Sequence, residues 1–259
     1  MTTPADLHEA ARIGFGAEAE AYARGRPEYP AGIVDWLRDE LGLGSGHLAV
    51  DLGAGTGKFT GRLLETGAEV VAIEPIPEMR AQLNARHPGL RILEGSAQAI
   101  PLPEASADAI VCAQAFHWFA TREALAEIRR VLRPGGSLGL VWNVRDESVP
   151  WVAALSELMR PHEGTAPRFY FGAWRAVFPA EGFGPLEVTR LRNHQRGEAE
   201  RVIVDRTLSV SFIANLPSLQ RSRFEADLRD LIAATPELRD AREVTFPYET
   251  VAYRTIRTG

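Results

Sequence analysis

This chain of 259 residues has little of what marks secreted, membrane-spanning or disulfide-stabilised proteins. Its one cysteine, Cys112, cannot form a disulfide within the chain, which is typical of a reducing compartment. Residues 1–8 contain no apolar run of the kind that signal peptides carry, and the longest apolar runs have only the length of a strand. We therefore predict a cytoplasmic protein with no membrane partner.

Two further absences narrow the chemistry. The chain has 29 Lys and Arg against 34 Asp and Glu, which gives a net charge of −5, and the two signs are interspersed along the sequence. Nucleic-acid-binding proteins, by contrast, usually carry a basic face. The six histidines and Cys112 have no metal-ligand spacing, and there is no G-x-S-x-G motif. The sequence predicts neither a nucleic-acid partner nor a metal, and it does not support hydrolysis.

What the chain does have is an apolar strand that runs into alternating glycines. Residues 49–57 read Ala-Val-Asp-Leu-Gly-Ala-Gly-Thr-Gly, and a helical pattern follows from Lys58. Glycine adopts positive φ readily and lets a ligand approach the main chain, and free N–H groups at a helix N-terminus can receive an anion. We therefore predict a ligand cradle at Gly53, Ala54, Gly55 and Gly57.

The spacing of these glycines argues against two nucleotide motifs. A G-x-G-x-x-G fingerprint counted from Gly53 needs glycine where Lys58 stands, and a P-loop needs Ser or Thr where Phe59 follows Gly57-Lys58. The pattern that fits is D-x-G-x-G-x-G, beginning at Asp51. An NAD-type Rossmann oxidoreductase is the less favoured alternative.

Strand-length apolar runs alternate with helical patterns along the first 145 residues. Strands are predicted at 48–52, 69–74, 90–94, 107–112 and 137–142, and helices at 30–41, 58–66, 77–87 and 121–132. This alternation indicates βαβ units and a parallel sheet, whose ligands bind at the carboxyl ends of the strands. The glycine loop, Glu74, Ser96 and Gln114 all follow predicted strands, so we expect them at one edge.

Four later segments form an ordered set with the glycine loop. They are Val70–Glu74, Gly95–Pro103, Asp108–Phe119 and Val131–Gly136. The set resembles the class I S-adenosylmethionine-dependent methyltransferases, in the type 11 branch with its trans-aconitate-methyltransferase-like enzymes, where Arg26-Pro-Glu-Tyr-Pro30 also occurs. The resemblance covers roughly residues 45–145. It implies a Rossmann-like α/β sheet of seven strands in the order 3-2-1-4-5-7-6, the last antiparallel, with helices on both faces and a helical cap.

The resemblance also suggests how the chain is organised. One methyltransferase domain would span residues 1–259, with a partly helical segment at 1–30 over the cofactor and a cofactor-binding core at 31–145. Residues of about 150–240 would form a lid on the substrate side, with helices at 151–160, 198–214 and 218–233. Strands are expected at 186–193 and at about 243–256, the latter being the final antiparallel strand.

The cofactor implied is S-adenosylmethionine, with S-adenosylhomocysteine as product and no metal. Asp51 would orient the loop, Glu74 would accept from two ribose hydroxyls, and Pro75 follows it. Ile76 and Met79 would flank the adenine, Ser96 stands where the family often has Asp, and the Ala97 N–H would face the ring. Gln114, Tyr22 and Arg26 complete the set. Plainer roles stay open: a helix N-cap for Asp51, a loop acid for Glu74, core packing for Met79, a strand-end amide for Gln114 and a surface position for Arg26.

The triplet His117-Trp118-Phe119 follows the fourth predicted strand, where methyl group and acceptor should meet. His117 is either a general base, since its ordinary pKa lies near neutrality, or a structural histidine. Trp118 either lines the pocket or belongs to the core, and Phe119 is expected in the core. Further substrate candidates, by placement alone, are Tyr29, Arg145 and Trp151.

The sequence thus predicts methyl transfer from S-adenosylmethionine to a small molecule, with an oxygen acceptor favoured. An acceptor that must lose a proton would need a base, whereas a carboxylate would need only a cationic partner. A methyltransferase-like binding protein without turnover is the other alternative. The assembly is expected to be a monomer or a homodimer.

Overall fold

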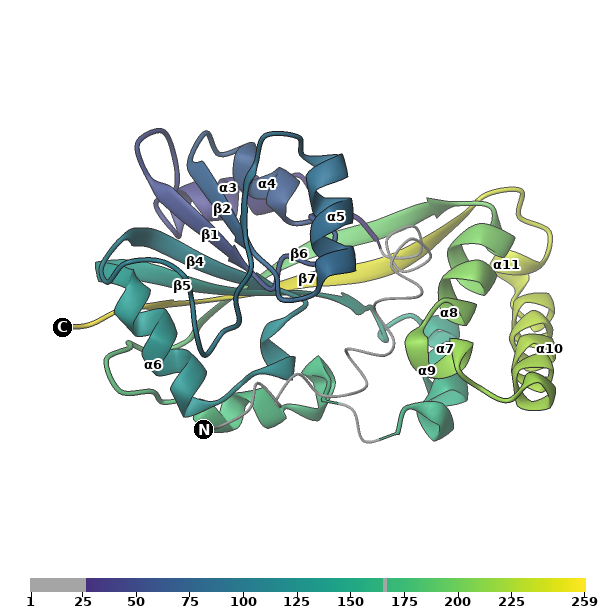
Figure 1. The fold of residues 1–259 in the computed structure, drawn as a ribbon. Helices are drawn as coiled ribbons and strands as arrows, with labels where there is room; N and C mark the ends of the chain where they lie inside the picture. The colour runs from purple at the N-terminus through teal and green to yellow at the C-terminus, as the bar shows by residue number, and fades with distance from the viewer. Residues whose placement is uncertain (1–26, 165–166) are drawn as a thin grey trace.

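A computed structural model describes residues 27–164 and 167–259 and contains a mixed seven-stranded sheet of order β3-β2-β1-β4-β5-β7-β6 (Figure 1). The first five strands pair in parallel, and β7 runs antiparallel to both β5 and β6. This confirms the predicted fold class and strand order. The strands are β1 (Leu48–Leu52), β2 (Glu69–Ile73), β3 (Arg91–Leu93), β4 (Ala107–Ala113), β5 (Leu132–Arg145), β6 (Glu187–Gly197) and β7 (Val244–Ile256).

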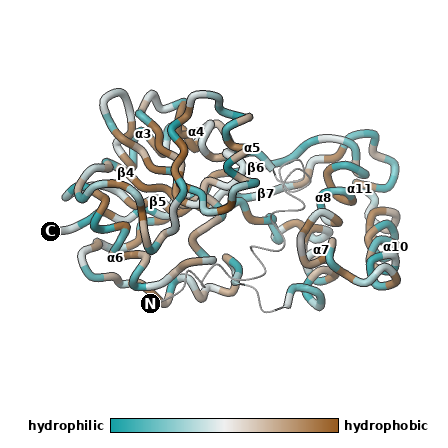
Figure 2. The backbone as a smooth tube through the Cα atoms, in the orientation of Figure 1, coloured by the Kyte–Doolittle hydropathy of each residue, from teal (hydrophilic) through white to brown (hydrophobic). Residues whose placement is uncertain are grey.

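Helices cover both faces of the parallel part of the sheet. One apolar cluster joins α3 (Gly32–Asp39) and α4 (Thr60–Leu64) to one face, and Leu83 of α5 (Pro77–Arg86) packs on Ala72 of that face. The other face packs against α6 (Arg122–Val131) and the short turns η1 (Phe116–Trp118) and η4 (Ala173–Val177). The central strands are buried on both faces, so they form the apolar runs seen in Figure 2.

Strands β6 and β7 extend well beyond the parallel sheet as a two-stranded ribbon (Figure 1). The far end of the ribbon carries a helical lobe with its own apolar cluster, in which Phe246 and Tyr248 of β7 pack against Phe224 and Leu228. The helices of this lobe are α7 (Pro150–Met159), α8 (Arg206–Leu208), α9 (Ser211–Ala214), α10 (Ser218–Ala234) and α11 (Pro236–Arg239).

Several element boundaries differ from the sequence prediction; strand β6, for example, runs to Gly197 and not to residue 193. The helix expected at 198–214 is broken into a π-helical turn, η5 (Glu200–Asp205), followed by α8 and α9. Strand β5 begins at Leu132, five residues early, because the Arg133–Gly136 turn interrupts but does not end its pairing with β4. The short helix α11 was not expected. Most of the partly helical segment expected at 1–30 lies outside the described residues.

Candidate active site

The carboxyl ends of the parallel strands bring the predicted motif residues to one edge of the sheet (Figure 1). Asp51 is the last residue but one of β1, Glu74 directly follows β2, and Gln114 directly follows β4. Because β1 pairs with both β2 and β4, these residues stand on neighbouring strands. The strand order reverses at β1, and open α/β sheets bind their ligands outside such a reversal.

Glu74 joins the glycine loop to the second strand. Its Oε2 accepts from the backbone N–H of Gly55 at 2.9 Å, and its Oε1 accepts from the N–H of Ile76 at 3.0 Å. The side chain is 5 % exposed, and burial raises the pKa of its carboxyl while the two backbone donors oppose that rise. Glu74 is therefore not a solvated loop acid: its carboxylate fixes the loop, and each oxygen keeps a further lone pair for a ligand.

The amides of the glycine loop are occupied, which corrects the expectation of free N–H groups there. Gly53 and Ala54 donate to the carbonyl of Ile73 at 2.9 and 3.2 Å, Gly57 donates to the carbonyl of Ala54 at 3.0 Å, and Gly55 donates to Glu74. These four donors are spent on holding the turn. At these four positions the loop therefore serves a ligand by its shape and not by free N–H groups.

The positive φ values of the three glycines have different consequences. They are 73° at Gly53, 56° at Gly55 and 82° at Gly57. A Cβ on Gly57 would lie 2.3 Å from Cδ1 of Leu83, so packing of α5 requires this glycine. A Cβ on Gly55 would meet nothing within 4 Å. The loop thus leaves open space at Gly55, where a ligand can reach the main chain.

Asp51 is a fully buried acid at the base of this space. Its Oδ2 accepts from Oγ1 of Thr60 at 2.6 Å, whereas its buried Oδ1 has no hydrogen-bond partner among the described residues. Burial, reinforced by the charge of Glu74 and opposed by Thr60, raises the pKa of Asp51 to about 7. A buried acceptor without a partner is costly, so Oδ1 is available to a donor or a positive charge of a ligand. The predicted N-cap role is not observed: α4 begins at Thr60.

The turn after Glu74 carries a small apolar surface. Arg80 donates to the backbone carbonyls of Glu74 and Pro75 at 2.9 and 2.7 Å and so holds the turn. Ile76 and Met79 are buried together as a pair separate from the larger apolar clusters. Such a pair, beside Glu74 and outside the main core, suits one side of a flat ring.

The loop after β3 is held by its own backbone. Ser96 and Ala99 exchange two N–H···O bonds, of 3.4 and 3.1 Å. Ser96 is half-buried, and Ala97 is 4 % exposed and packs with the main core.

Gln114 adopts a strained backbone conformation at the end of β4. Its φ is 56°, a value uncommon outside glycine that costs about 1–3 kcal/mol. Its N–H donates to the carbonyl of Val141 at 2.8 Å, and its Nε2 donates to the carbonyl of Asn143 at 3.0 Å. The strain is maintained by β5 and turns the chain sharply into η1.

His117 lies in η1 and contacts a tryptophan that the sequence did not single out. The indole Nε1 of Trp142, on β5, donates to Nδ1 of His117 at 3.0 Å. Trp142 is fully buried, while His117 and Trp118 are half-buried. Phe119 packs against the core cluster, as expected.

Two substrate candidates lie in apolar cores. Tyr29 is 5 % exposed and packs edge-on to Phe59, with ring centroids 4.8 Å apart. Trp151 is 6 % exposed and packs edge-on to Phe246 at 5.0 Å within the helical lobe. Both side chains pack in apolar clusters, and their role towards a substrate stays a prediction.

Arg145 stands at the end of β5, where the chain leaves the sheet for the helical lobe. It is half-buried, and its Nη1 approaches Sδ of Met159 to 2.9 Å. This position keeps Arg145 as a substrate candidate. The predicted cofactor residues Tyr22 and Arg26 lie outside the described residues.

A charged cluster beside the glycine loop was missed by the sequence analysis. Nζ of Lys58 lies 3.1 Å from Oε1 of Glu28, and Nη2 of Arg86 lies 3.6 Å from the same oxygen. Burial lowers the pKa of Lys58, Glu28 opposes this, and the positive charges of Arg86 and Arg206 lower it further. Arg206 belongs to α8 and is 7 % exposed. Lys58 served in the sequence only to exclude a motif, and no spacing connects it to Arg206.

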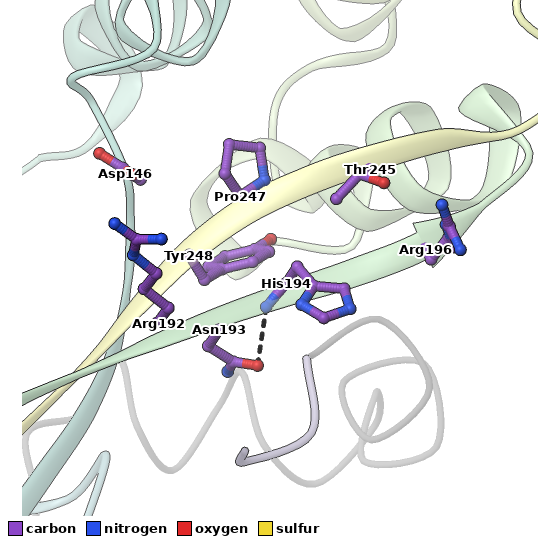
Figure 3. A pocket seen from close by; sticks show the side chains of 8 residues that line it. All are labelled: Asp146, Arg192, Asn193, His194, Arg196, Thr245, Pro247 and Tyr248. Atoms are coloured by element: carbon purple, nitrogen blue, oxygen red, sulfur yellow. Dashed lines mark hydrogen bonds between the residues drawn. The ribbon is translucent and has the colours of Figure 1, made fainter. Parts of the chain in front are cut away.

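A second polar surface lies on the β6–β7 ribbon (Figure 3). It is an open hollow of about 400 Å³ lined by Asp146, Arg192, Asn193, His194, Arg196, Thr245, Pro247 and Tyr248. Its cations are exposed, and Nε of Arg196 lies 3.4 Å from Glu243. Asp146 and Arg192 both line this hollow, and none of its lining residues belongs to the glycine loop.

The comparisons with known proteins agree with this geometry. A methyltransferase domain family matches residues 50–140. A methyltransferase-like protein of Schizosaccharomyces pombe is 38% identical over 242 residues, 92% of this chain and 93% of its own. A methyltransferase of Mycobacterium tuberculosis is 39% identical over 246 residues, 93% and 95% of the two chains. The structure of a type II methyltransferase from Anaeromyxobacter dehalogenans has a TM-score of 0.68 at 25% identity and covers 90% of this chain and 97% of that one.

The fold and the glycine edge define an S-adenosylmethionine-dependent enzyme of the Rossmann-like class. The chain belongs to the class I methyltransferases of type 11. The residues present fit the cofactor: Asp51 offers an unpartnered buried oxygen, Glu74 offers two oxygens, and Gly55 leaves open space. Among the described residues there is no cluster of potential metal ligands, and none of their helices is long and apolar enough to span a bilayer.

Proposed function

We propose that this methyltransferase transfers the methyl group to an oxygen atom of a small, negatively charged acceptor. S-Adenosylmethionine supplies a methyl group already activated by its positive sulfur. The protein then contributes alignment and exclusion of water, and such positioning is worth about 7–11 kcal/mol in well-oriented intramolecular reactions. Asp51, the loop 53–57, Glu74–Ile76, Met79, Ser96, Ala97 and Gln114 would hold the cofactor.

We infer the negative charge of the acceptor from the cluster of charged side chains at Lys58. Lys58 and Arg86 both lie beside the carboxylate of Glu28, and the positive charge of Arg206 lowers the pKa of Lys58. Burial already disfavours the charged form of Lys58, and its cationic neighbours disfavour it further, so an added anion would be stabilising. A carboxylate or phosphate on the acceptor supplies such an anion.

The same cluster supports a lid role for residues of about 150–240. Arg206 reaches from α8 of the lobe close enough to Lys58 to lower its pKa. We therefore propose that the lobe faces the cofactor edge of the core at residues 31–145; β7 is the final antiparallel strand. The related prediction for residues 1–30 concerns mostly residues outside the described ranges.

A matched glycine pair tests cofactor binding. Gly55→Ala would place a Cβ in the open space of the loop, whereas Gly42→Ala adds the same Cβ at φ 68° in open space before β1. We expect calorimetry to detect S-adenosylmethionine binding in the wild type and Gly42→Ala, and at least about tenfold weaker binding in Gly55→Ala, for a lost contact of roughly 1.4 kcal/mol. Binding of NAD instead would support the oxidoreductase alternative.

Product chemistry tests the acceptor. The enzyme is incubated with labelled S-adenosylmethionine and panels of small carboxylic acids, alcohols, phenols and amines, and methylated products are identified by mass spectrometry. An oxygen-methylated small acid supports the proposal. Methyl transfer to nitrogen or carbon contradicts it, and cofactor binding without turnover across the panels supports the binding-protein alternative.

Arg206→Ala tests which of two anions the cluster at Lys58 binds. If it serves the acceptor, KM for the acid should rise while Kd for S-adenosylmethionine stays constant. If it serves the cofactor's own carboxylate, Kd should rise instead. Arg229→Ala, on the exposed surface of the same lobe, is the matched control.

A further inference from the structure

His87 lies directly after α5 and contacts the backbone of the glycine loop. Its Nε2 is 2.8 Å from the carbonyl oxygen of Gly57. A carbonyl oxygen only accepts hydrogen bonds, so Nε2 must carry a proton and donate it. The neutral ring with its proton on Nε2 and the imidazolium can both do so. The bond therefore ties the end of α5 to the loop, whichever charge the imidazole carries.

The ring of His87 also packs closely against the loop. A Cβ on Gly57 would lie 2.9 Å from Cδ2 of His87, in addition to its clash with Leu83. In the first turn of α4, a Cβ on Gly61 would lie 3.5 Å from Cε1 of His87, an ordinary contact distance. The half-buried imidazole thus rests against the main chain at two places, and Gly57 leaves the room that the ring occupies.

The other contacts of the loop hold its strand side. The N–H of Gly57 donates to the carbonyl of Ala54 at 3.0 Å, and the N–H of Gly55 donates to Glu74 at 2.9 Å. His87 acts on the opposite side, where the loop leads into α4. The turn at Gly55 therefore lies between a hydrogen bond from β2 on one side and a hydrogen bond from the end of α5 on the other.

The same helix holds the second turn of the cofactor edge. Arg80 of α5 donates to the carbonyls of Glu74 and Pro75 at 2.9 and 2.7 Å, and Met79 packs against Ile76. Helix α5 thus contacts the turn after β2 through its first half and the glycine loop through its end. A shift of α5 relative to the sheet would move both turns together.

We propose that His87 is a positioning residue for S-adenosylmethionine: by holding the Gly57 carbonyl, it fixes the turn that leaves open space at Gly55. This rests on the proposed contact between the glycine loop and the cofactor. The imidazole acts through the main chain of the loop. Without its N–H the peptide planes of residues 55–57 would be less constrained, and the cofactor would have to order them on binding, at a cost in affinity.

Two substitutions separate the hydrogen bond of His87 from its packing. His87→Gln places an amide nitrogen the same number of bonds from Cα as Nε2 of histidine, so it can still donate to the Gly57 carbonyl. His87→Leu keeps apolar volume at this place but has no donor. The matched control is His47→Leu, at an exposed histidine before β1.

Calorimetry with S-adenosylmethionine measures the effect on the cofactor. We expect the affinity to fall about two- to tenfold in His87→Leu, the value of one hydrogen bond, to recover most of this loss in His87→Gln and to stay unchanged in His47→Leu. A purely structural role would lower the free energy of unfolding, measured in urea, without changing the affinity of the folded variants. Equal affinity in the wild type and all three variants overturns the inference alone. No binding by the wild type refutes the proposed function, and the inference with it.

Amide exchange without cofactor tests the loop itself. In His87→Leu we expect the N–H groups of Gly55 and Gly57 to exchange about two- to tenfold faster, while those of β1 and β2 keep their wild-type rates. His87→Gln should restore slow exchange. Nitrogen NMR of the wild type should show a protonated Nε2 in the neutral ring. A neutral ring with its proton on Nδ1, or unchanged exchange at both glycines in His87→Leu, overturns the inference.

Discussion

The cofactor edge and the helical lobe are held together by different kinds of buried groups. At the edge, two acids, Asp51 and Glu74, are buried and hydrogen-bonded to Thr60 and to backbone N–H groups. In the lobe a large apolar cluster is buried, together with Arg206 and Thr207 of α8, and the ion pairs of Arg229 lie on the surface. The edge thus depends on particular residues at particular spacings, whereas the lobe depends on buried apolar area, which many residues can supply.

The largest effect should come from the lobe core, and it should leave the edge intact. Phe224 is 2 % exposed on α10, and Phe224→Ala should lower the free energy of unfolding by about 3–5 kcal/mol. Affinity for S-adenosylmethionine should change little at a temperature where the variant is folded. Urea denaturation and calorimetry measure the two quantities. Leu219→Ala, 66 % exposed on the same helix, is the control; equal destabilisation of both variants would show that burial is not the cause.

Glu74→Gln tests the opposite half of the comparison. The new amide keeps one acceptor for the two N–H groups of Gly55 and Ile76 and turns a donor towards the other. We expect a loss of about 1–3 kcal/mol in stability and at least about tenfold weaker cofactor binding.

The control for Glu74 is Glu94→Gln, whose side chain is 75 % exposed and contacts Arg80. Glu94→Gln should leave the affinity for S-adenosylmethionine, measured by calorimetry, unchanged. If Glu74→Gln bound the cofactor as well as Phe224→Ala does, the division between edge and lobe would not hold.

The pH dependence of stability sharpens the comparison through Asp51. Its pKa of about 7 exceeds the ordinary 3.8 because of burial, so the folded state holds the proton more tightly than the unfolded chain. This tighter proton binding contributes to the free energy of unfolding. The contribution is fully present below about pH 4 and is lost as the pH rises to 7. Asp51→Asn lacks this loss, so its stability relative to wild type should improve by up to about 4 kcal/mol between about pH 4 and about pH 8.

Denaturation curves at both pH values test this relation. Thr60→Val provides the companion variant, because it removes the hydrogen bond that opposes the rise in the pKa of Asp51. The loss of stability should then extend to higher pH than in the wild type. Parallel stability–pH curves for wild type and Asp51→Asn would mean that Asp51 stays ionised in the folded protein.

The same difference explains what could be predicted from the sequence. The binding edge and Glu74 followed from glycine spacing and from apolar runs, because positive φ at Gly53 to Gly57 is a local demand that only certain residues meet. The strand order followed from the resemblance to the methyltransferase family. Three features depend on packing between distant segments. They are the hydrogen bonds made by the loop amides, the Trp142–His117 hydrogen bond and the approach of Arg206 to Lys58. No local pattern records such contacts, and the π-helical break at 200–205 is hidden by a helical period on both sides.

The smallest effect should come from the surface of the lobe, where Arg229 bridges two acids. It lies 2.7 Å from Glu200 and 2.9 Å from Glu225, and its hydrogen bond lowers the pKa of Glu200. All three side chains are exposed, so water and salt screen the attraction, and holding long side chains in one geometry offsets much of what is left. We expect Arg229→Ala to change Tm slightly in dilute buffer and not at all in about 1 M salt, measured by thermal denaturation. A large, salt-independent fall in Tm would mean that this network, like the acids of the cofactor edge, is part of what defines the structure of the lobe.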